Sequence, residues 1–404
     1  MAYLSRLHLT NFRNFSDLEL NLAPGVAVFF GDNAQGKTTL LEAVYLLAIA
    51  RSFRAENERE VVSFRAGLQG EQAVVSGTVE KNNQRLSINI GYQSVASKGN
   101  GDSLASRGES EQLEGRGSDV SRYSVRKEIR VNRTRRTATD LVGLVGAVLF
   151  SADDIDLVYG PPSGRRRYLD ILISQSNPLY IKGLQRYQKV VQQRNQLLRM
   201  LREGRAESVE LEFWNDELVR EGAGIIWQRQ ETMRKLSRFS AEHQQQLSGV
   251  DEEFHVEYRP SVPCGGSLQD TKERFHESLA AFHRRELATS ATAVGPHRDD
   301  FKLVVNGMDM GTFASRGEAR TLALTLRLAE ASYLASTRGD EPIVLLDDVL
   351  SELDPSRRQR VLEKITRYQQ VLITTTDLEM VRHYFGDQAS YFKVTGGQVT
   401  PWNE

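Results

Sequence analysis

One stretch of eight residues constrains this chain more than any other. Gly31 to Thr38 reads Gly-Asp-Asn-Ala-Gln-Gly-Lys-Thr and matches the G-x-x-x-x-G-K-[ST] pattern of a phosphate-binding P-loop. The apolar run 25–30 precedes it, and apolar residues recur at helical spacing from Leu40 to Ala48. The motif therefore stands at a strand-to-helix turn, where unpaired backbone N–H groups and the helix dipole favour an anion.

The residue types in this loop suit the binding of phosphate and metal. Gly31 and Gly36 allow the backbone to wrap a phosphate without interference from a Cβ atom. Lys37 can reach the β- and γ-phosphates, and the Thr38 hydroxyl can ligate Mg²⁺. The pattern predicts ATP and Mg²⁺ as ligands, with Lys37 also acting in catalysis. The predicted ATP-binding residues are Gly31, Asp32, Asn33, Ala34, Gln35, Gly36, Lys37, Thr38 and Thr39.

A P-loop needs a second Mg²⁺ ligand, which is normally an aspartate at the end of a neighbouring apolar strand. Residues 343–346, Ile-Val-Leu-Leu, form such a run, and Asp347 and Asp348 follow it. We expect Asp347 to hold the metal through water and Asp348 to stand where a hydrolytic base would. Because most of the chain lies between Lys37 and Asp347, the nucleotide-binding domain is predicted to be split by an insertion.

The insertion is predicted to be a helical arm. Residues 178–247 contain little Gly or Pro, and two segments with helical apolar spacing are separated at 202–205, where Gly204 suits a helix stop. The predicted fold class is α/β, with a P-loop ATPase head of mixed sheet and helices split by this α-helical arm. We place the N-terminal half of the head at residues 1–175, the arm at 176–285 and the C-terminal half of the head at 286–404.

Residues 94–121 differ in composition from their surroundings. They are rich in Ser, Gly and scattered charges and contain few large apolar side chains. Such a segment cannot bury enough surface to offset the entropy of ordering. We therefore expect a disordered surface loop inserted in a hairpin.

Composition excludes several classes of protein. No apolar run is long enough to span a bilayer and the N-terminus lacks a signal-peptide pattern, so a cytoplasmic protein is expected. The single cysteine, Cys264, excludes an internal disulfide and a cysteine-based metal site. Because the net charge is −1, any binding of nucleic acid must come from local basic patches.

Short basic stretches are the candidates for such patches. Arginines can neutralise DNA phosphates, and the same residues can equally form solvated corners and helix ends, so both interpretations stay open. The candidate DNA-binding residues are Arg51, Arg54, Arg133, Arg135, Arg136, Arg165, Arg166 and Arg167.

Two loops near Asp347 sharpen the prediction. Ser315 and Gly317-Glu318 stand at the start of an apolar helix and resemble the signature loop of ABC-type ATPases, in which a helix N-terminus and the serine hydroxyl face a γ-phosphate. Residues 351–355, Ser-Glu-Leu-Asp-Pro, follow Asp348 and resemble the ABC D-loop. A serine or aspartate before a helix is usually only a cap, so it is the order and spacing of these motifs that carry the argument.

Taken together, the motifs resemble the ABC-type ATPases of the SMC class, and most closely the RecF family of bacterial recombination mediators. The segments that carry this resemblance cover nearly the whole chain. They are residues 9–15, 31–39, 150–170, 295–300, 315–320 and 345–354.

The resemblance implies an ATP-dependent homodimer that binds double-stranded and gapped DNA. In that family the homodimer acts in recombinational repair and replication-fork maintenance, and it helps to load the recombinase together with RecR/RecO-type mediators. ATP would lie between the P-loop of one subunit and Ser315, Gly317, Glu318 and Asp354 of the other. Two alternatives remain, a nonhydrolytic ATP-gated DNA-binding module and a transporter-type nucleotide-binding subunit, although the latter would not need so long an arm.

The sequence also departs from the ABC pattern. ABC enzymes commonly carry a histidine after the strand that follows the Asp-ended strand. Here that strand is predicted at 371–373, and residues 371–377 contain no histidine. No clear glutamine stands after Phe150 where many relatives place one, and Asp153 or Asp154 is the nearest candidate. Asp348 is one methylene shorter than the usual glutamate. No carboxylate pairing or nucleophile is visible for His297, which is interpreted as structural.

These departures predict a weak, DNA-stimulated ATPase that works as a timer and not as a motor. The expected steady-state turnover is below roughly 10 per second, the median for enzymes. The measurement is ATP hydrolysis by the wild type and by Asp348→Asn. A rate at or above that median, unaffected by the change at Asp348, would contradict the prediction.

Overall fold

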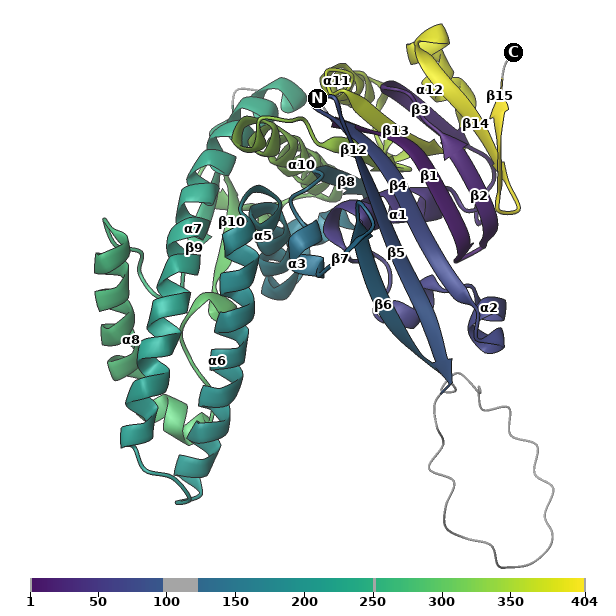
Figure 1. Cartoon of the computed structure of the whole chain (residues 1–404). Helices are drawn as coiled ribbons and strands as arrows, with labels where there is room; N and C mark the ends of the chain where they lie inside the picture. The colour runs from purple at the N-terminus through teal and green to yellow at the C-terminus, as the bar shows by residue number, and fades with distance from the viewer. Residues whose placement is uncertain (1, 97–122, 250–251, 403–404) are drawn as a thin grey trace, which may run out of the picture.

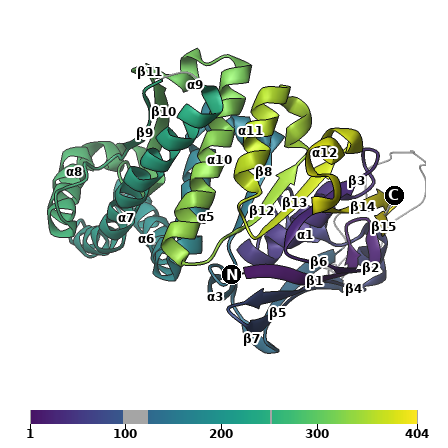
Figure 2. The ribbon, with the colours of Figure 1, turned by 90° about the horizontal axis from the view of Figure 1, so that it is seen from above.

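The structure is a computed structural model that describes residues 2–96, 123–249 and 252–402. Two sheets with helix α1 between them form one side of the molecule, and long helices form the other (Figures 1 and 2). The predicted insert 94–121 lies outside the described residues except for its first three, which continue a strand. Within the described ranges, no helix combines the length and the apolar character that crossing a membrane requires.

The first sheet is antiparallel and has six strands in the order β2-β1-β4-β5-β6-β7. Buried and partly exposed residues alternate along β1 and β4, as expected for a sheet with one face on the core. The basic stretch 134–136, predicted to be a loop, is the short strand β7. The bounds are β1 Ala2–Phe12, β2 Phe15–Asn21, β4 Gln72–Lys81, β5 Gln84–Ala96, β6 Tyr123–Val131 and β7 Thr134–Arg136.

The second sheet carries the P-loop strand. Its order is β15-β14-β3-β13-β12-β8, parallel from β14 to β8, with β15 antiparallel at the edge. The strands predicted at 25–30, 343–346 and 371–373 are confirmed as β3, β12 and β13. The bounds are β3 Gly25–Phe30, β8 Ala147–Ser151, β12 Ile343–Asp347, β13 Gln370–Thr375, β14 Ala389–Thr395 and β15 Gln398–Trp402.

Helix α1, Lys37–Ile49, packs between the two sheets. It contacts β4 and β5 of the first sheet and β8, β12 and β13 of the second. Every residue of α1 except Thr38 is buried, which explains why the helix is apolar on all sides. The one partly exposed residue is the one that the P-loop motif assigns to the metal.

The second sheet divides the hydrophobic core into two clusters. Val344 and Leu346 of β12 point to the cluster shared with the long helices, whereas Ile343 and Leu345 point to the cluster shared with α1 and the first sheet. A strand buried on both faces reads as a continuous apolar run and not as an alternating one, as the sequence of β12 does.

The helical arm is built on an antiparallel helix pair, as predicted. Helix α6, Pro178–Arg202, ends at the predicted turn, Gly204 takes a positive φ of 69°, and α7, Val209–Ser248, returns along it. Helix α8, Leu268–Thr289, packs against both (Figure 1). The predicted boundary at residue 285 therefore falls inside α8, which is longer than the sequence suggested.

A small sheet also belongs to this side of the molecule. Strands β9, Phe254–Arg259, and β10, Asp300–Val305, pair antiparallel beside α7, and β11, Met308–Asp309, pairs with β10. Residues 300–309, which we predicted to lie in the head, thus pair with an arm strand. Strand pairing between distant segments leaves no local trace in the sequence, which is why this was missed.

The remaining helices lie in and between these units. Helix α10 follows the predicted signature loop and packs against α7, α5 and β8, and so joins the arm to the head. Their bounds are α2 Phe64–Gln69, α3 Ala138–Leu141, α4 Asp156–Tyr159, α5 Pro162–Ser176, α9 Met310–Phe313, α10 Arg316–Arg338, α11 Pro355–Ile365 and α12 Leu378–Phe385.

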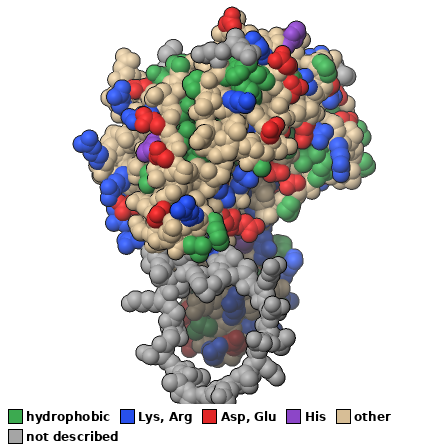
Figure 3. Space-filling view, turned by 90° about the vertical axis from the view of Figure 1, so that its right-hand side faces the viewer, with side chains coloured by type: hydrophobic (Ala, Val, Ile, Leu, Met, Phe, Trp, Pro, Cys, Tyr) green, Lys and Arg blue, Asp and Glu red, His purple; other side chains and the backbone are tan. Residues whose placement is uncertain are grey.

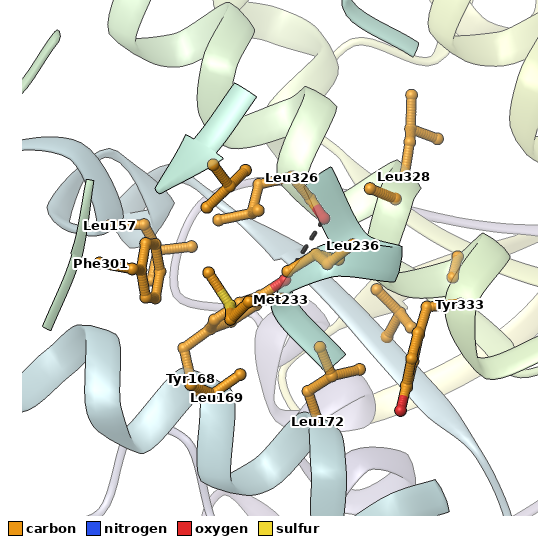
Figure 4. Close-up of a cluster of buried hydrophobic side chains, with 14 of the residues drawn as sticks. Leu157, Tyr168, Leu169, Leu172, Met233, Leu236, Phe301, Leu326, Leu328 and Tyr333 are labelled. Atoms are coloured by element: carbon orange, nitrogen blue, oxygen red, sulfur yellow. Dashed lines mark hydrogen bonds between the residues drawn. The ribbon is translucent and has the colours of Figure 1, made fainter. Parts of the chain in front are cut away.

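Apolar side chains of α5, α7 and α10 pack together where the arm meets the head (Figure 4). Met233 and Leu236 of α7 face Tyr168 of α5 and Leu326 of α10, and all four are at most 5% exposed. The Tyr168 hydroxyl donates to the Leu326 carbonyl at 3.4 Å. Close packing of this kind joins the arm to the head through a shared core.

Inside the arm, one buried ion pair stands out. Arg194 of α6 and Glu286 of α8 are almost fully buried, and their Nη2 and Oε2 atoms lie 2.6 Å apart. The other guanidinium nitrogens of Arg194 donate to Asn215 and to Thr292, both at 2.9 Å. The arginine that interrupts the apolar pattern of α6 is therefore a fully bonded core residue.

Removing one partner of this pair is expected to be costly. Arg194→Met leaves the Glu286 carboxylate buried without its cation, so the free energy of unfolding should fall by about 3–5 kcal/mol. Adding Glu286→Leu should recover much of that loss. Urea unfolding of both variants measures this, with Arg220→Ala as a control that removes an exposed pair with Glu217 and should cost less than about 1 kcal/mol. Equal stability of Arg194→Met and the control would contradict the assignment.

Candidate nucleotide-binding site

The P-loop has the backbone that only glycine permits at two positions. A Cβ atom on Gly31 would lie 2.3 Å from the Val394 carbonyl oxygen. Gly36, with φ of 116°, caps the N-terminus of α1, and a Cβ there would lie 2.6 Å from the Asn14 side chain. The loop therefore packs so closely on β14 and the β1–β2 turn that larger residues cannot replace either glycine.

Gln35 holds the loop in place from outside. Its Oε1 accepts from the Gly396 N–H at 2.6 Å, and its carbonyl oxygen accepts from Asn14 Nδ2 at 3.0 Å and from the Gly397 N–H at 3.2 Å. These contacts reach the β14–β15 turn and the β1–β2 turn. The loop is thus shaped before any ligand binds.

Lys37 closes the loop across its mouth. Its Nζ donates to the carbonyl oxygens of Gly31 at 2.7 Å and Asp32 at 2.8 Å. Burial lowers the pKa of Lys37, while the charges of Asp348, Asp347 and Asp32 oppose that effect. The ammonium group lies where a phosphate entering the loop would meet it.

Thr38 and Asp347 meet although they come from opposite ends of the chain. The Thr38 hydroxyl donates to Asp347 Oδ1 at 2.8 Å, and the Thr374 hydroxyl of β13 donates to the same oxygen at 2.8 Å. Burial raises the pKa of Asp347, and the two hydrogen bonds oppose that rise. The predicted metal residues are therefore side by side.

This pair has the chemistry of a Mg²⁺ site. Mg²⁺ prefers oxygen ligands and is usually held by one or two carboxylates together with water and substrate phosphates. Among the residues that the structure describes, no group of three or more His, Cys, Asp or Glu side chains could hold a metal alone. Thr38 and Asp347 fit an ion that depends on the nucleotide for its remaining ligands.

Asp348 follows Asp347 in the chain and has an unusual backbone conformation and an unpaired side-chain oxygen. Its backbone is left-handed, with φ of 52°, and its N–H donates to the Thr374 hydroxyl and carbonyl oxygens at 3.1 and 3.3 Å. Its Oδ1 is buried and has no hydrogen-bond partner. An unpartnered carboxylate oxygen in a polar cleft is suited to accept a hydrogen bond from a water molecule.

These groups line a cleft of about 670 Å³, which is large enough for a nucleotide. The cleft also contains residues that the sequence did not identify, namely Arg13, Arg59, Phe64 and Leu68. Arg13 is fixed by a bidentate bond to Glu42 of α1, whose carboxylate is fully buried, at 3.0 and 2.6 Å. Glu42 in the middle of an otherwise apolar helix was the signal that could have revealed this cationic partner.

Two apolar side chains of α2 are exposed at this cleft. Phe64 is 70% exposed and Leu68 is 55% exposed. Exposed large apolar groups beside a polar cleft often mark a surface that a ligand or a partner covers.

The predicted signature and D-loop residues lie elsewhere. Ser315 accepts from the Glu318 N–H at 3.3 Å in a capping box, and Asp354 accepts from the Arg357 N–H at 3.0 Å. Both side chains and Gly317 are exposed, and none of them lines the cleft. An ion pair of 3.0 Å between Arg320 and Glu352 ties the two loops to each other. One chain thus presents a P-loop cleft and, separately, a signature surface.

The basic candidates separate into three groups. Arg165 makes a bidentate pair with Asp300 at 2.7 and 2.9 Å, and Arg166 donates to the Asp299 carbonyl, so both serve internal contacts. Arg54 lines the nucleotide cleft, and Arg51 and Arg167 line a second cleft. Arg133, Arg135 and Arg136, on the outer hairpin β6–β7, are all exposed.

One face of the molecule shows a mixed distribution of charge. On the face of the molecule seen in Figure 3, basic and acidic side chains are interspersed. This distribution agrees with the net charge of −1. Attraction of a polyanion would therefore depend on local clusters and not on a uniform field.

Asp154 and His297 have structural surroundings. Asp154 pairs with Arg327 of α10 at 2.6 Å and does not line the nucleotide cleft. His297 Nε2 donates to the Thr292 carbonyl at 3.1 Å while Nδ1 accepts from the Tyr187 hydroxyl at 2.7 Å. Burial lowers the pKa of His297 to about 4, which keeps the ring neutral. This geometry agrees with a structural role for His297.

Known proteins share this architecture along the whole chain. The family model for the RecF/RecN/SMC N terminal domain matches residues 3–398. The DNA replication and repair protein RecF of Herpetosiphon aurantiacus is 38% identical over 402 residues, covering 99% of this chain and 100% of that protein. The chain belongs to the RecF family. The RecF of Geobacillus kaustophilus is 34% identical over 402 residues, with 98% and 99% of the two chains covered.

Solved structures agree with the family. A structure of the recombination mediator protein RecF with ATP has a TM-score of 0.84 and 31% identity, covering 100% of this chain and 98% of that one. An Smc head domain from Pyrococcus furiosus has a TM-score of 0.52 at 14% identity, which shows a shared fold alone. As in other RecF-family chains, the fold is therefore that of an SMC-like ABC ATPase.

Proposed function

We propose that this protein is an ATP-dependent DNA-binding protein of recombinational repair and replication-fork maintenance. Its relatives at 34–38% identity carry the name DNA replication and repair protein RecF. The solved relative is titled a recombination mediator protein in the RecFOR pathway. RecR/RecO-type mediators are the partners that this kinship suggests, and the cytoplasm is the compartment where such a protein would act.

ATP is proposed to join two copies of the chain. The observation that carries this proposal is the separation of Ser315, Gly317, Glu318 and Asp354 from the cleft that Lys37 lines in the same chain. A second copy would complete the cleft with these residues, because a helix N-terminus offers N–H groups to a γ-phosphate. The exposed Phe64 and Leu68 beside the cleft would be covered in the same step.

The residues of one cleft have distinct proposed tasks. Lys37 and the loop N–H groups would bind and orient the phosphates, and Thr38 and Asp347 would hold Mg²⁺, which neutralises phosphate charge when bound. Asp348 would accept a proton from the attacking water through its unpartnered Oδ1. Slow hydrolysis fits this arrangement, because the Asp348 side chain is one methylene shorter than the glutamate usual at this position.

For DNA we propose the outer hairpin as the contact surface. Arg133, Arg135 and Arg136 are exposed, whereas Arg165 and Arg166 are used internally and Arg54 lies in the nucleotide cleft.

The domain division is also proposed with one revision. The head would be formed by both ends of the chain, and the arm would extend past residue 285 to include α8 and the β9–β10–β11 sheet.

Dimerisation is tested by sedimentation with and without ATP, Mg²⁺ and duplex DNA. The wild type should change from monomer to dimer when ATP and Mg²⁺ are added. Lys37→Met should abolish pairing because nucleotide is no longer held, and Ser315→Arg should abolish pairing while nucleotide binding is retained.

The contrast between these two variants is the control. Titration of a fluorescent ATP analogue should give wild-type affinity for Ser315→Arg and a loss of at least tenfold for Lys37→Met. A wild type that stays monomeric when saturated with ATP, Mg²⁺ and duplex would overturn the proposal.

The DNA surface is tested through salt dependence. Each phosphate contact contributes about 0.9 to the slope of log affinity against log salt. Replacing Arg133, Arg135 and Arg136 together by alanine should lower that slope by about 1–3 and weaken duplex binding, measured by fluorescence anisotropy between 50 and 200 mM salt, roughly the range in which such effects are large.

A matched variant removes the same charge elsewhere. Arg220, Arg234 and Arg238 of α7 are each paired with a nearby glutamate, and their triple alanine variant should leave the slope unchanged. Equal slopes for the hairpin variant and the wild type would remove the hairpin from the DNA surface.

A further inference from the structure

A second cleft lies where the arm meets the head. Its volume is about 600 Å³, and it shares no lining residue with the nucleotide cleft. Its walls come from the C-terminal part of α1, from α5 and from the first half of α6. Nothing in the proposed nucleotide or DNA function uses this space.

One wall of the cleft is aliphatic. The lining includes Ile49, Val142, Ile171, Ile181, Leu184 and Val191. Four of these, on α5 and α6, are only partly buried. Partly exposed aliphatic side chains that converge on a concave surface offer a favourable site for another apolar group, because water is displaced when that group enters.

The same cleft is also lined by two cationic side chains, Arg51 and Arg167. Arg51 follows α1 and Arg167 lies on α5, both line the cleft, and their charges repel each other. No ion pair or side-chain hydrogen bond is recorded for either within the described part of the chain, whereas other lining charges are satisfied. Asp170 pairs with Arg229 at 2.8 Å, and Arg166 donates to the Asp299 carbonyl at 2.9 Å.

We propose that this cleft binds an acidic peptide segment of a partner protein that carries an aliphatic or aromatic side chain. A carboxylate between Arg51 and Arg167 would relieve their repulsion and form charge-assisted hydrogen bonds. The adjacent apolar side chain would cover the wall formed by Ile171, Ile181 and Leu184. Charge complementarity and the aliphatic wall together select this occupant.

Nucleic acid fits the cleft less well. A duplex backbone could contact the two arginines, but it has no apolar group to cover the aliphatic wall. An unpaired base needs an exposed aromatic face for stacking. Tyr45 is buried with its ring against Phe53 at 5.6 Å, and Tyr187 is buried and bonded to His297. The aromatic residues of the cleft are therefore not available as stacking platforms.

The experiment selects peptides from a random dodecamer library displayed on phage, with the full chain immobilised. Enriched peptides should contain at least two acidic residues beside an aliphatic or aromatic residue. When synthesised with a fluorescent label, they should bind the wild type at least tenfold more tightly than Arg51→Glu/Arg167→Glu, as measured by anisotropy. Leu184→Gln should also weaken binding, because it changes the wall without changing a charge.

The matched control is Arg199→Glu/Arg202→Glu, which reverses the same number of exposed charges at the end of α6. It should bind the peptides as the wild type does, and circular dichroism should show every variant folded. Enrichment of no peptides, of peptides without acidic residues, or of peptides that bind the charge-reversed variant equally well would overturn the proposal. The proposal would also be overturned if no peptide were selected and the Arg51→Glu/Arg167→Glu variant instead lost binding to a 30-nucleotide single strand or to its duplex.

Discussion

The hydrogen bond between Thr38 and Asp347 is the contact on which the rest of this structure depends. It joins residues 309 positions apart, and it can form only because β3, β13 and β12 are neighbours in a parallel sheet. Parallel strands place their carboxyl ends at one edge, so the loop after β3 and the aspartates after β12 arrive together. Thr374 at the end of β13 completes the contact by bonding the same carboxylate oxygen.

Buried polar groups that serve the fold have hydrogen-bond partners, whereas one carboxylate oxygen at the nucleotide cleft has none. Glu42 is fully buried and is satisfied by Arg13 and Ser52, and Arg194 is fully buried and satisfied by Glu286, Thr292 and Asn215. Such networks hold elements together, because unsatisfied groups of this kind would be costly. Asp348 keeps a buried oxygen without a partner, in a left-handed backbone. Other buried side chains without a partner, such as Ser240 and His243, lie outside the nucleotide cleft, so it is the position of Asp348 beside Thr38 and Asp347 that makes it a candidate site residue.

Packed contacts and ion pairs connect the signature loop to the head and to the arm. Helix α10 begins at the signature loop, and its Arg327 reaches Asp154 after β8 while its apolar face packs against α7. The Arg320–Glu352 pair connects that loop to the D-loop. A series of packed contacts thus runs from the signature loop along α10 to α7, and the second cleft lies where the arm meets the head.

The sequence alone was sufficient to predict the features that a few adjacent residues encode. The P-loop, the Asp-ended strand, the helix caps at Ser315 and Asp354 and the turn at Gly204 are each encoded by a few adjacent residues, and all of them appear in the structure. Only the tertiary structure decided which charges are free. Arg165 and Arg51 look alike in the sequence, but Arg165 meets Asp300 from a distant strand and Arg51 faces a cleft. It also decided that β10 pairs with β9 and that Arg13 lines the candidate nucleotide cleft, because long-range partners are fixed by how the elements pack and not by neighbours in the chain.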